Sequence, residues 1–192
     1  SLIIEEGTPF YDRYHDHPEL LPDENEEREM YYLTKQFLHS HGFERYEISN
    51  YAKPGYECRH NTGYWIGTEY LGLGLGASSY IQGFRFCNEK DLGAYCRLKM
   101  QQEDVDDYLH KEIVRLTEKE KMEEFMFLGM RLIRGVSEKE FEKRFGIGLR
   151  DVYGNVLDRL LKNRLIVAEE PYVRLSEFGI DISNYVLSEF LL

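Results

Sequence analysis

Apolar residues recur at strand and helix spacings through the first fifty positions of the chain. Leu2-Ile3-Ile4 predicts a short buried strand, and Asp23 followed by Glu26 is a capping-box pattern that predicts a helix over residues 24–41. Alternating apolar positions in residues 43–49 predict a second strand. Because the connection is long enough for a parallel pair, we expect a right-handed β-α-β crossover.

The pattern continues up to a change in composition near residue 104. It predicts these further elements: strands at residues 70–75 and 80–87, and a helix at residues 89–103. A short acidic stretch, Glu103-Asp104-Val105-Asp106-Asp107, then indicates a domain boundary. We therefore expect a first domain over residues 1–104 and a second domain over residues 108–192.

The second predicted domain is mainly helical. Its expected elements are a helix from Thr117 to Gly135, a helix from Ser137 to about Phe145, a helix around residues 152–161, a hairpin of residues 165–168 and 172–175, and a last helix from Ser176 to Phe190. Three helices followed by a two-stranded wing are typical of a winged helix, a fold that often binds DNA. Residues 139–164 hold only 7 basic against 4 acidic side chains, so we expect packing or partner docking here and no nucleic acid.

Charge and cysteine content narrow the classes of function. The 192 residues carry a net charge of −11, and residues 1–109 hold 10 Lys and Arg against 20 Asp and Glu, which argues against a nucleic-acid groove there. Cys58, Cys87 and Cys96 form no CxxC or CxxxCxxC motif and favour a reducing cytoplasm. The chain starts without Met in the middle of a strand pattern, so we expect it to be part of a longer protein.

The segment from Cys58 to Trp65 is the richest in candidate chemistry. It combines the only Trp of the chain with one of three Cys and one of six His. Cys58 and His60 supply at most two ligands, whereas zinc usually takes three or four. Haem iron needs only one or two axial ligands, and Tyr64 and Trp65 could cover a macrocycle. Core packing explains the same aromatic side chains, so spacing alone leaves haem, zinc and packing open.

A glycine-rich run follows at residues 72–77. Gly72, Gly74 and Ala77 match the form GxGxx(G/A), but the next residues favour a strand or loop instead of the helix that nucleotide binding requires. The missing side chains of the run, which also contains Gly76, let either a ligand or a neighbouring backbone come close. Both interpretations stay open at this point.

Three strings along the chain are specific enough to indicate a family. They are residues 46–61, the pair Tyr64-Trp65 and residues 70–74. Together they resemble the HemW proteins, radical SAM relatives of oxygen-independent coproporphyrinogen III oxidase. The resemblance implies an α/β fold, namely the C-terminal part of a radical SAM (β/α) partial barrel followed by a small helical, winged-helix-like domain.

The same resemblance implies a tetrapyrrole ligand. His60-Asn61 and Tyr64-Trp65 match the HNxxYW motif of HemW-type haem chaperones, which implies His60 as a ligand of haem iron and Asn61, Tyr64 and Trp65 as further haem contacts. The alternative is the oxidase itself, which decarboxylates the propionates of coproporphyrinogen III through a 5′-deoxyadenosyl radical. The motif favours the chaperone.

Further cofactors and partners are implied in the same way. The complete protein would carry a [4Fe–4S] cluster and S-adenosylmethionine, with the cluster ligands outside this sequence and Gly72, Gly74 and Gly76 near the cofactor end. The implied partner is a recipient haemoprotein, met in the cytoplasm or peripherally at the membrane, with residues 108–192 as a candidate docking module. Because a partial barrel leaves apolar faces and strand edges open, we also expect a homodimer.

Overall fold

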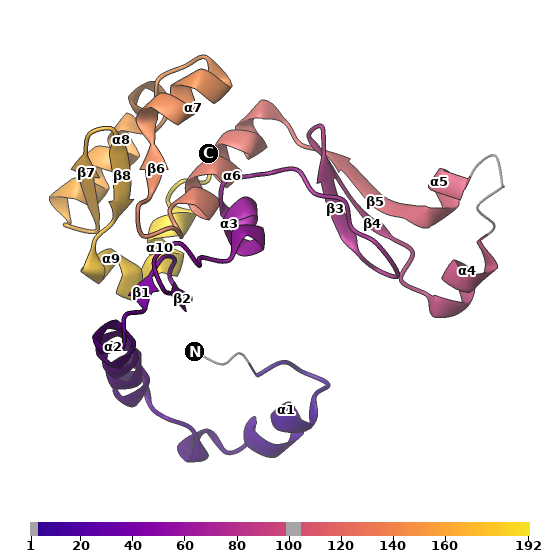
Figure 1. The fold of residues 1–192 in the computed structure, drawn as a ribbon, viewed down its shortest axis with the longest axis horizontal. Helices are drawn as coiled ribbons and strands as arrows, with labels where there is room; N and C mark the ends of the chain where they lie inside the picture. Colours follow the sequence, from indigo (N-terminus) through magenta and orange to yellow (C-terminus); the bar gives the residue numbers. More distant parts are fainter. Residues whose placement is uncertain (1–3, 99–104) are drawn as a thin grey trace. The chain divides into compact units, whose positions relative to one another are not determined.

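The structure is a computed structural model that describes residues 4–98 and 105–192. The chain forms two compact units, Ser1–Glu57 and Cys58–Leu192. Figure 1 shows the order of the helices and strands along the chain. Because the two units are separate bodies, each one is described by itself.

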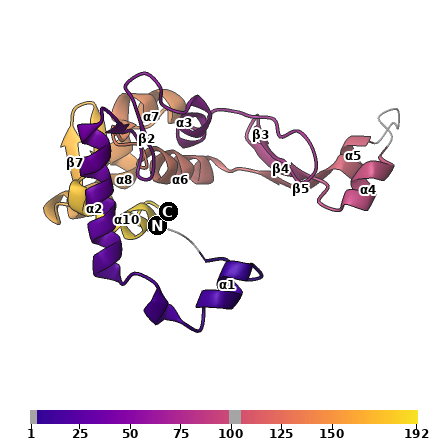
Figure 2. The same ribbon diagram turned by 60° about the horizontal axis from the view of Figure 1, so that its bottom comes forward.

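The first unit contains one long helix. Its elements are α1 (Pro9–Tyr14), the 3-10 helix η1 (Pro18–Leu20), α2 (Glu24–Ser40), β1 (Glu44–Arg45) and β2 (Tyr51–Ala52), and Figure 2 shows α1 and α2 joined through η1. The predicted capping box of α2 is confirmed. The Asp23 carboxylate accepts from the backbone N–H groups of Asn25 and Glu26, and the Glu26 carboxylate accepts from the Asp23 N–H. The predicted helix over residues 24–41 is therefore confirmed to within one residue.

The strand predicted at residues 43–49 is shorter than expected. Only β1 forms, and it pairs antiparallel with β2. The cause is a side-chain turn, because Glu47 Oε1 accepts from the Ser49 N–H at 3.1 Å and from Asn50 Nδ2 at 2.5 Å, which ends the extended backbone. The strand predicted at residues 2–4 lies outside the described residues except for Ile4, which is not in a strand. The parallel crossover therefore stays a prediction.

The second unit begins with a helix and a three-stranded sheet. These elements are α3 (Arg59–Trp65), β3 (Ser78–Ile81), β4 (Phe84–Asn88), α4 (Leu92–Arg97), α5 (Val105–Leu109) and β5 (His110–Arg115). The strands pair antiparallel in the order β3-β4-β5. Arg85 of β4 forms a bidentate ion pair with Glu124, with N···O distances of 3.1 and 2.8 Å. This pair connects the sheet to the helix that follows β5.

Two sequence predictions are wrong in this region, and a third is confirmed only in part. The single strand at residues 80–87 is a hairpin, because Gln82 and Gly83 both have positive φ and form its two-residue turn. The strand at residues 70–75 is a single bridge from Tyr70 to Tyr80. The helix predicted at residues 89–103 is only α4 within the described part, since residues 99–104 are outside it, and β5 was not predicted at all.

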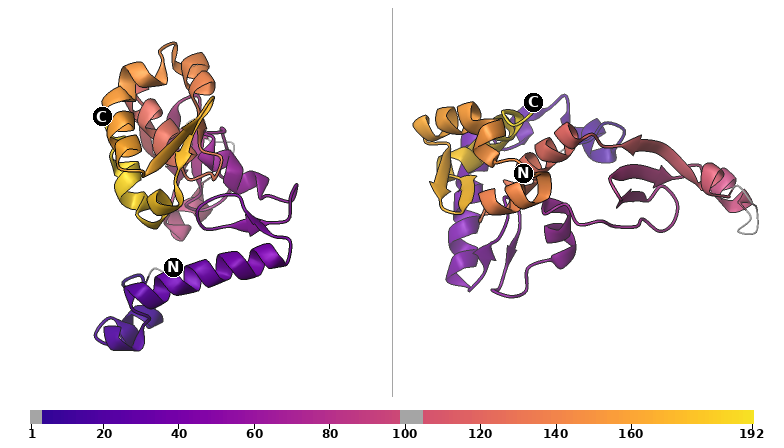
Figure 3. Two further views of the ribbon diagram at one scale, coloured as in Figure 1. Left: turned by 90° about the vertical axis from the view of Figure 1, so that its left-hand side faces the viewer. Right: turned by 90° about the horizontal axis from the view of Figure 1, so that it is seen from above.

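The rest of the second unit has the order of a winged helix. Its elements are α6 (Glu118–Gly129), β6 (Val136–Ser137), α7 (Glu138–Phe145), α8 (Leu149–Lys162), β7 (Ile166–Glu169), β8 (Tyr172–Leu175), α9 (Glu177–Asp181) and α10 (Ser183–Ser188). The sheet order is β6-β8-β7, all antiparallel. Figure 3 shows these elements, coloured salmon to yellow, clustered together. The winged-helix arrangement and its hairpin are thereby confirmed.

Two helix boundaries in this region differ from the predictions. The helix α6 ends at Gly129 instead of Gly135, and the last helix is divided at Ile182, which leaves helical geometry with φ −118°. Thr117 and Glu120 form a capping box where the predicted helix α6 begins, and Ser137 caps α7 by accepting from the Glu140 N–H. Among the described residues no helix combines the length and apolar character needed to cross a membrane.

Aromatic rings hold the core of the winged helix together. Phe141 is fully buried and meets Phe125, Phe145 and Tyr153 with ring centroids 5.3, 4.7 and 6.0 Å apart. Tyr153 in turn meets Phe190 at 5.6 Å, nearly edge to face. Such pairs add about 0.5–1.5 kcal/mol each beyond the area that they bury. The helices α6, α7, α8 and the C-terminal end of the chain are therefore joined through one cluster.

The hydroxyl of Tyr153 is the weak point of this cluster. It is buried without a hydrogen-bond partner among the described residues, and burial raises the pKa of Tyr153. Because a buried unpaired hydroxyl is costly, we expect Tyr153→Phe to leave the free energy of unfolding unchanged or to raise it by about 1 kcal/mol. Phe141→Ala, which removes a ring from the same cluster, should lower it by about 3–5 kcal/mol. Urea unfolding of both variants tests this, and a large loss in Tyr153→Phe would contradict it.

Candidate functional site

The helix α3 carries the four motif residues and is fixed at its C-terminal end by a Schellman motif. The N–H of Gly67 donates to the Tyr64 carbonyl at 3.2 Å, and the N–H of Thr68 donates to the Gly63 carbonyl at 2.8 Å. Gly67 has φ +69°, a left-handed conformation that glycine adopts without steric cost. The segment after Trp65 therefore turns sharply away from the helix axis.

His60 is the exposed member of the motif. It lies four residues before Tyr64, so that both side chains share one face of α3, and their ring centroids are 4.7 Å apart at an interplanar angle of 76°. Within the described residues its ring nitrogens have no hydrogen-bond partner. The His60 imidazole is exposed, its nitrogens are available to a ligand, and it packs against a tyrosine ring. These properties fit the requirement for an axial ligand of haem iron.

A row of tyrosines supports this face. Tyr64 meets Tyr70 edge to face with centroids 4.8 Å apart, and Tyr70 meets Tyr80 at 6.5 Å. The backbones of Tyr70 and Tyr80 also exchange two hydrogen bonds of 2.9 Å. The cavity of about 110 Å³ beside these rings is too small for a tetrapyrrole, so a macrocycle on His60 would lie outside it. Tyr80 was not among the site residues predicted from the sequence, although Tyr70 belongs to one of the three family strings.

Trp65 points to a different neighbour. It lies five positions after His60, which places the two side chains about 140° apart around the helix, at 100° per residue. The guanidinium Cζ of Arg131 lies 4.6 Å from the centroid of the Trp65 ring, and α3 packs against α6. The structure therefore does not place the four motif residues on one face. Asn61, directly after His60, is half-buried, and no sequence pattern pointed to Arg131.

The glycine run packs against the β3–β4 hairpin. A Cβ at Gly72 would lie 2.3 Å from the Ser78 carbonyl oxygen, so only glycine allows this close approach. The Nδ2 of buried Asn88 donates to the carbonyls of Gly72 and Gly74, and the N–H of Gly76 donates to the Glu89 carbonyl at 2.9 Å. The interpretation as backbone packing is thus supported at Gly72, and the strand after the run is confirmed as β3. Proximity of these glycines to a cofactor stays a prediction.

The three cysteines differ in environment. Cys58 and Cys96 are exposed, and Cys58 is the residue that precedes α3. Cys87 is buried, its thiol donates to Glu112 at 3.5 Å, and burial raises the pKa of that thiol. In the part of the chain that the structure describes, no group of three or more His, Cys, Asp or Glu side chains could hold a metal ion. A zinc site built on Cys58 and His60 would need further ligands, whereas haem iron needs only one.

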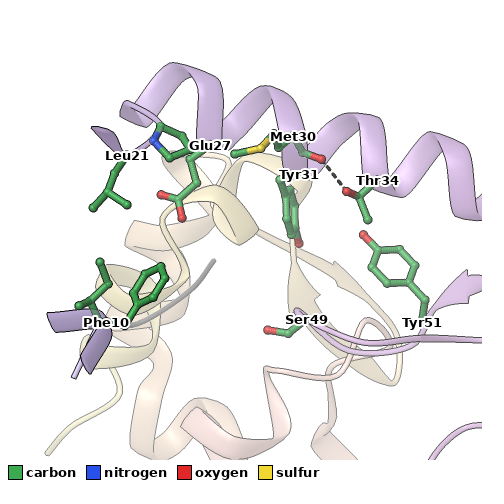
Figure 4. A pocket seen from close by; sticks show the side chains of 10 residues that line it. Phe10, Leu21, Glu27, Met30, Tyr31, Thr34, Ser49 and Tyr51 are labelled. Atoms are coloured by element: carbon green, nitrogen blue, oxygen red, sulfur yellow. Dashed lines mark hydrogen bonds between the residues drawn. The ribbon is translucent and has the colours of Figure 1, made fainter. Parts of the chain in front are cut away.

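The first unit contains a larger cavity of about 620 Å³. Figure 4 shows Phe10 and Leu21 on one side of it and the polar tips of Tyr31, Ser49 and Tyr51 on the other. The residues that line it are Ile4, Phe10, Leu21, Pro22, Glu27, Met30, Tyr31, Thr34, Ser49 and Tyr51. None of the candidate haem or cofactor contacts predicted from the sequence is among these described lining residues.

The described residues thus define an α/β protein that ends in a winged-helix domain and presents an exposed histidine backed by tyrosines. Comparison with known proteins shows which proteins this chain is similar to. Residues 116–182 match the model of the HemN C-terminal domain. The chain is 32% identical over 192 residues to the haem chaperone HemW of Lactococcus lactis subsp. lactis and 36% identical over 191 residues to that of Bacillus subtilis. All of this chain and 49% of each relative are covered, so the chain spans about half the length of these proteins.

A solved structure gives the same result for the fold. The Escherichia coli coproporphyrinogen III oxidase HemN, described as a radical SAM enzyme, superposes with a TM-score of 0.67 at 18% identity, covering 88% of this chain and 42% of that one. The resemblance found in the sequence is therefore confirmed: the chain is similar to HemW proteins along its whole length, and it shares the fold of HemN over 88% of its length. The expected α/β fold class is confirmed with it.

The turn after α3 gives a prediction about stability. Gly67→Ala forces a side chain into the left-handed region and should lower the free energy of unfolding by about 1–2 kcal/mol. Gly154, inside α8, is the matched control, because a Cβ there meets nothing within 4 Å. Gly154→Ala should raise stability by about 0.5–1 kcal/mol. Denaturant unfolding followed by circular dichroism measures both, and equal effects of the two changes would contradict the assigned turn.

Proposed function

We propose that this chain is part of a haem chaperone that holds haem iron through the imidazole of His60. The observation that carries the proposal is the exposed His60 ring, uncommitted among the described residues and braced by Tyr64, in a chain similar to HemW proteins over its whole length. The relatives' name, haem chaperone, supplies the ligand. The exposure of the site suits a protein that must release what it carries.

The residues of α3 would have separate tasks in haem binding. In its neutral form, the imidazole of His60 would donate a nitrogen lone pair to the iron. Tyr64 restricts the rotation of that imidazole by edge-to-face contact. Trp65 packs against Arg131 and holds the helix in place, and its contact with haem stays a prediction. Asn61, half-buried beside His60, stays a predicted haem contact.

A cluster and S-adenosylmethionine are proposed only for a longer protein that contains this sequence. The HemN structure is described as that of a radical SAM enzyme, and a [4Fe–4S] cluster of this kind needs three closely spaced cysteines. Cys58, Cys87 and Cys96 do not have that spacing, and they differ in burial. The residues present do not fit a cluster, so no radical step is assigned to this chain.

The second candidate function is the oxidative decarboxylation of coproporphyrinogen III. It rests on the fold that the chain shares with HemN at 18% identity. The identities of 32% and 36% to HemW favour the chaperone. In both cases the proposed ligand is a tetrapyrrole.

Two proposals concern organisation and partners. We keep the domain boundary between residues 104 and 108, because the match to the HemN C-terminal domain lies at residues 116–182, inside the second domain. That domain is also our candidate for docking a recipient haemoprotein. Cytoplasmic location, with peripheral contact at a membrane, is proposed together with this recipient.

Haem titration tests the proposed function. Wild-type protein, expressed with any sequence that its gene encodes before residue 1, should show saturable binding in the Soret region. His60→Ala should raise the Kd at least about tenfold, because the iron loses its protein ligand. His17→Ala is the control, since His17 is an exposed histidine paired with Glu19. Equal binding by wild type and His60→Ala would remove His60 from the site, and coproporphyrinogen turnover would then be measured.

The predicted homodimer has a test of its own. Met30, Leu33 and Phe37 lie along one side of α2 and are 46%, 56% and 63% exposed, although an apolar side of a helix is usually buried. A second copy of the chain would cover this surface. Light scattering should give a dimer mass for the wild type and a monomer mass for Leu33→Glu/Phe37→Glu. A monomeric wild type would contradict the prediction.

A further inference from the structure

Arg131 is a half-buried cation without an anionic partner among the described residues. It lies just past the end of α6, and its guanidinium rests on the Trp65 ring. Four other arginines of the same unit are paired with acids: Arg85 with Glu124, Arg150 with Asp158, Arg159 with Glu189 and Arg174 with Glu169. Because a partly buried charge is stabilised by an anionic partner, the guanidinium of Arg131 is a candidate contact for an anion that is not part of the chain.

The same contact contains two hydrogen-bond donors that lack acceptors. Arg131 Nε and Trp65 Nε1 are both buried and unpaired in the part of the chain that the structure describes. An indole N–H and a guanidinium can only donate, so the missing group must be an acceptor. A carboxylate offers two oxygens with several lone-pair sites, and it matches the planar fork of arginine.

We propose that Arg131 and Trp65 form the recognition site for a carboxylate of the bound tetrapyrrole, an inference that rests on the haem-binding function proposed above. Along α3, Trp65 is about 7.5 Å from His60 at 1.5 Å per residue, and it faces another side. Separate anchors of this kind suit a ligand whose iron lies at its centre and whose carboxylates lie at its edge. The Arg131 side chain is half-buried, so part of it is open to a ligand.

The site gives the HemN C-terminal domain a part in ligand binding. Arg131 belongs to residues 116–182, whereas His60 precedes them. Haem would therefore be bound by two segments that are distant in sequence, and losing either contact would weaken it. This differs from a purely partner-docking role for the C-terminal domain.

Blocking the carboxylates of the ligand tests the proposal. Haem and haem dimethyl ester are titrated, in the same detergent, into wild type, Arg131→Gln and the control Arg134→Gln, each with any sequence that the gene encodes before residue 1. Arg134 is an exposed arginine in the same loop. Arg131→Gln should weaken haem binding about tenfold more than it weakens ester binding, whereas Arg134→Gln should change neither. Circular dichroism confirms that the variants are folded.

Every other outcome overturns the carboxylate site. If Arg131→Gln weakens both ligands equally, Arg131 acts only by packing on Trp65. If it weakens neither, the ligand does not reach Arg131. The two titrations of the wild type are a test by themselves. If the wild type binds haem and haem dimethyl ester with equal affinity, the protein does not recognise the carboxylates. A wild type that binds neither ligand contradicts the proposed function itself, which distinguishes that failure from the loss of the carboxylate site alone.

Discussion

The contact between Trp65 and Arg131 is the constraint on which the geometry of the motif depends. The helix α3 has seven residues, too few to be stable in water by itself, so tertiary packing must hold it. The cation–π contact supplies about 0.5–2 kcal/mol and joins the end of α3 to the end of α6. His60 is carried on the same short helix, so its position is fixed by a residue that is distant in the sequence.

A second set of contacts reaches α6 by another route. Tyr64 packs on Tyr70, which pairs with Tyr80 across a backbone bridge. The guanidinium of Arg85 lies 5.0 Å from the Tyr80 ring centroid and forms its bidentate pair with Glu124 of α6. The motif helix is therefore linked to α6 through Trp65 on one face and through the tyrosines and the hairpin on the other. This double attachment lets an exposed imidazole keep a defined position.

The parts of the fold that could be predicted from the sequence are those that depend on residues close together in the chain. The capping boxes at Asp23 and Thr117 and the wing hairpin depend on side chains within a few residues of each other. The errors arise where a single side chain or a distant backbone decides the outcome. The Glu47 carboxylate accepts hydrogen bonds from Ser49 and Asn50, and the predicted strand ends there. The backbone of Gly72 packs against Ser78 and does not form the predicted strand. The spacing of apolar residues along the chain predicts neither the Glu47 hydrogen bonds nor the close packing of Gly72.

The candidate site shows the same division between local and distant information. The motif string selected His60, Asn61, Tyr64 and Trp65, but it could not show that two faces of one helix are involved, because Arg131 is far along the chain. Placing Trp65 against Arg131 leaves the His60 face open, and the small cavity beside the tyrosines cannot enclose a macrocycle. On the proposed function, affinity must then come from a few directed contacts instead of burial. Such contacts can be exchanged one at a time with a recipient, whereas a ligand enclosed in a pocket would need the protein to open first.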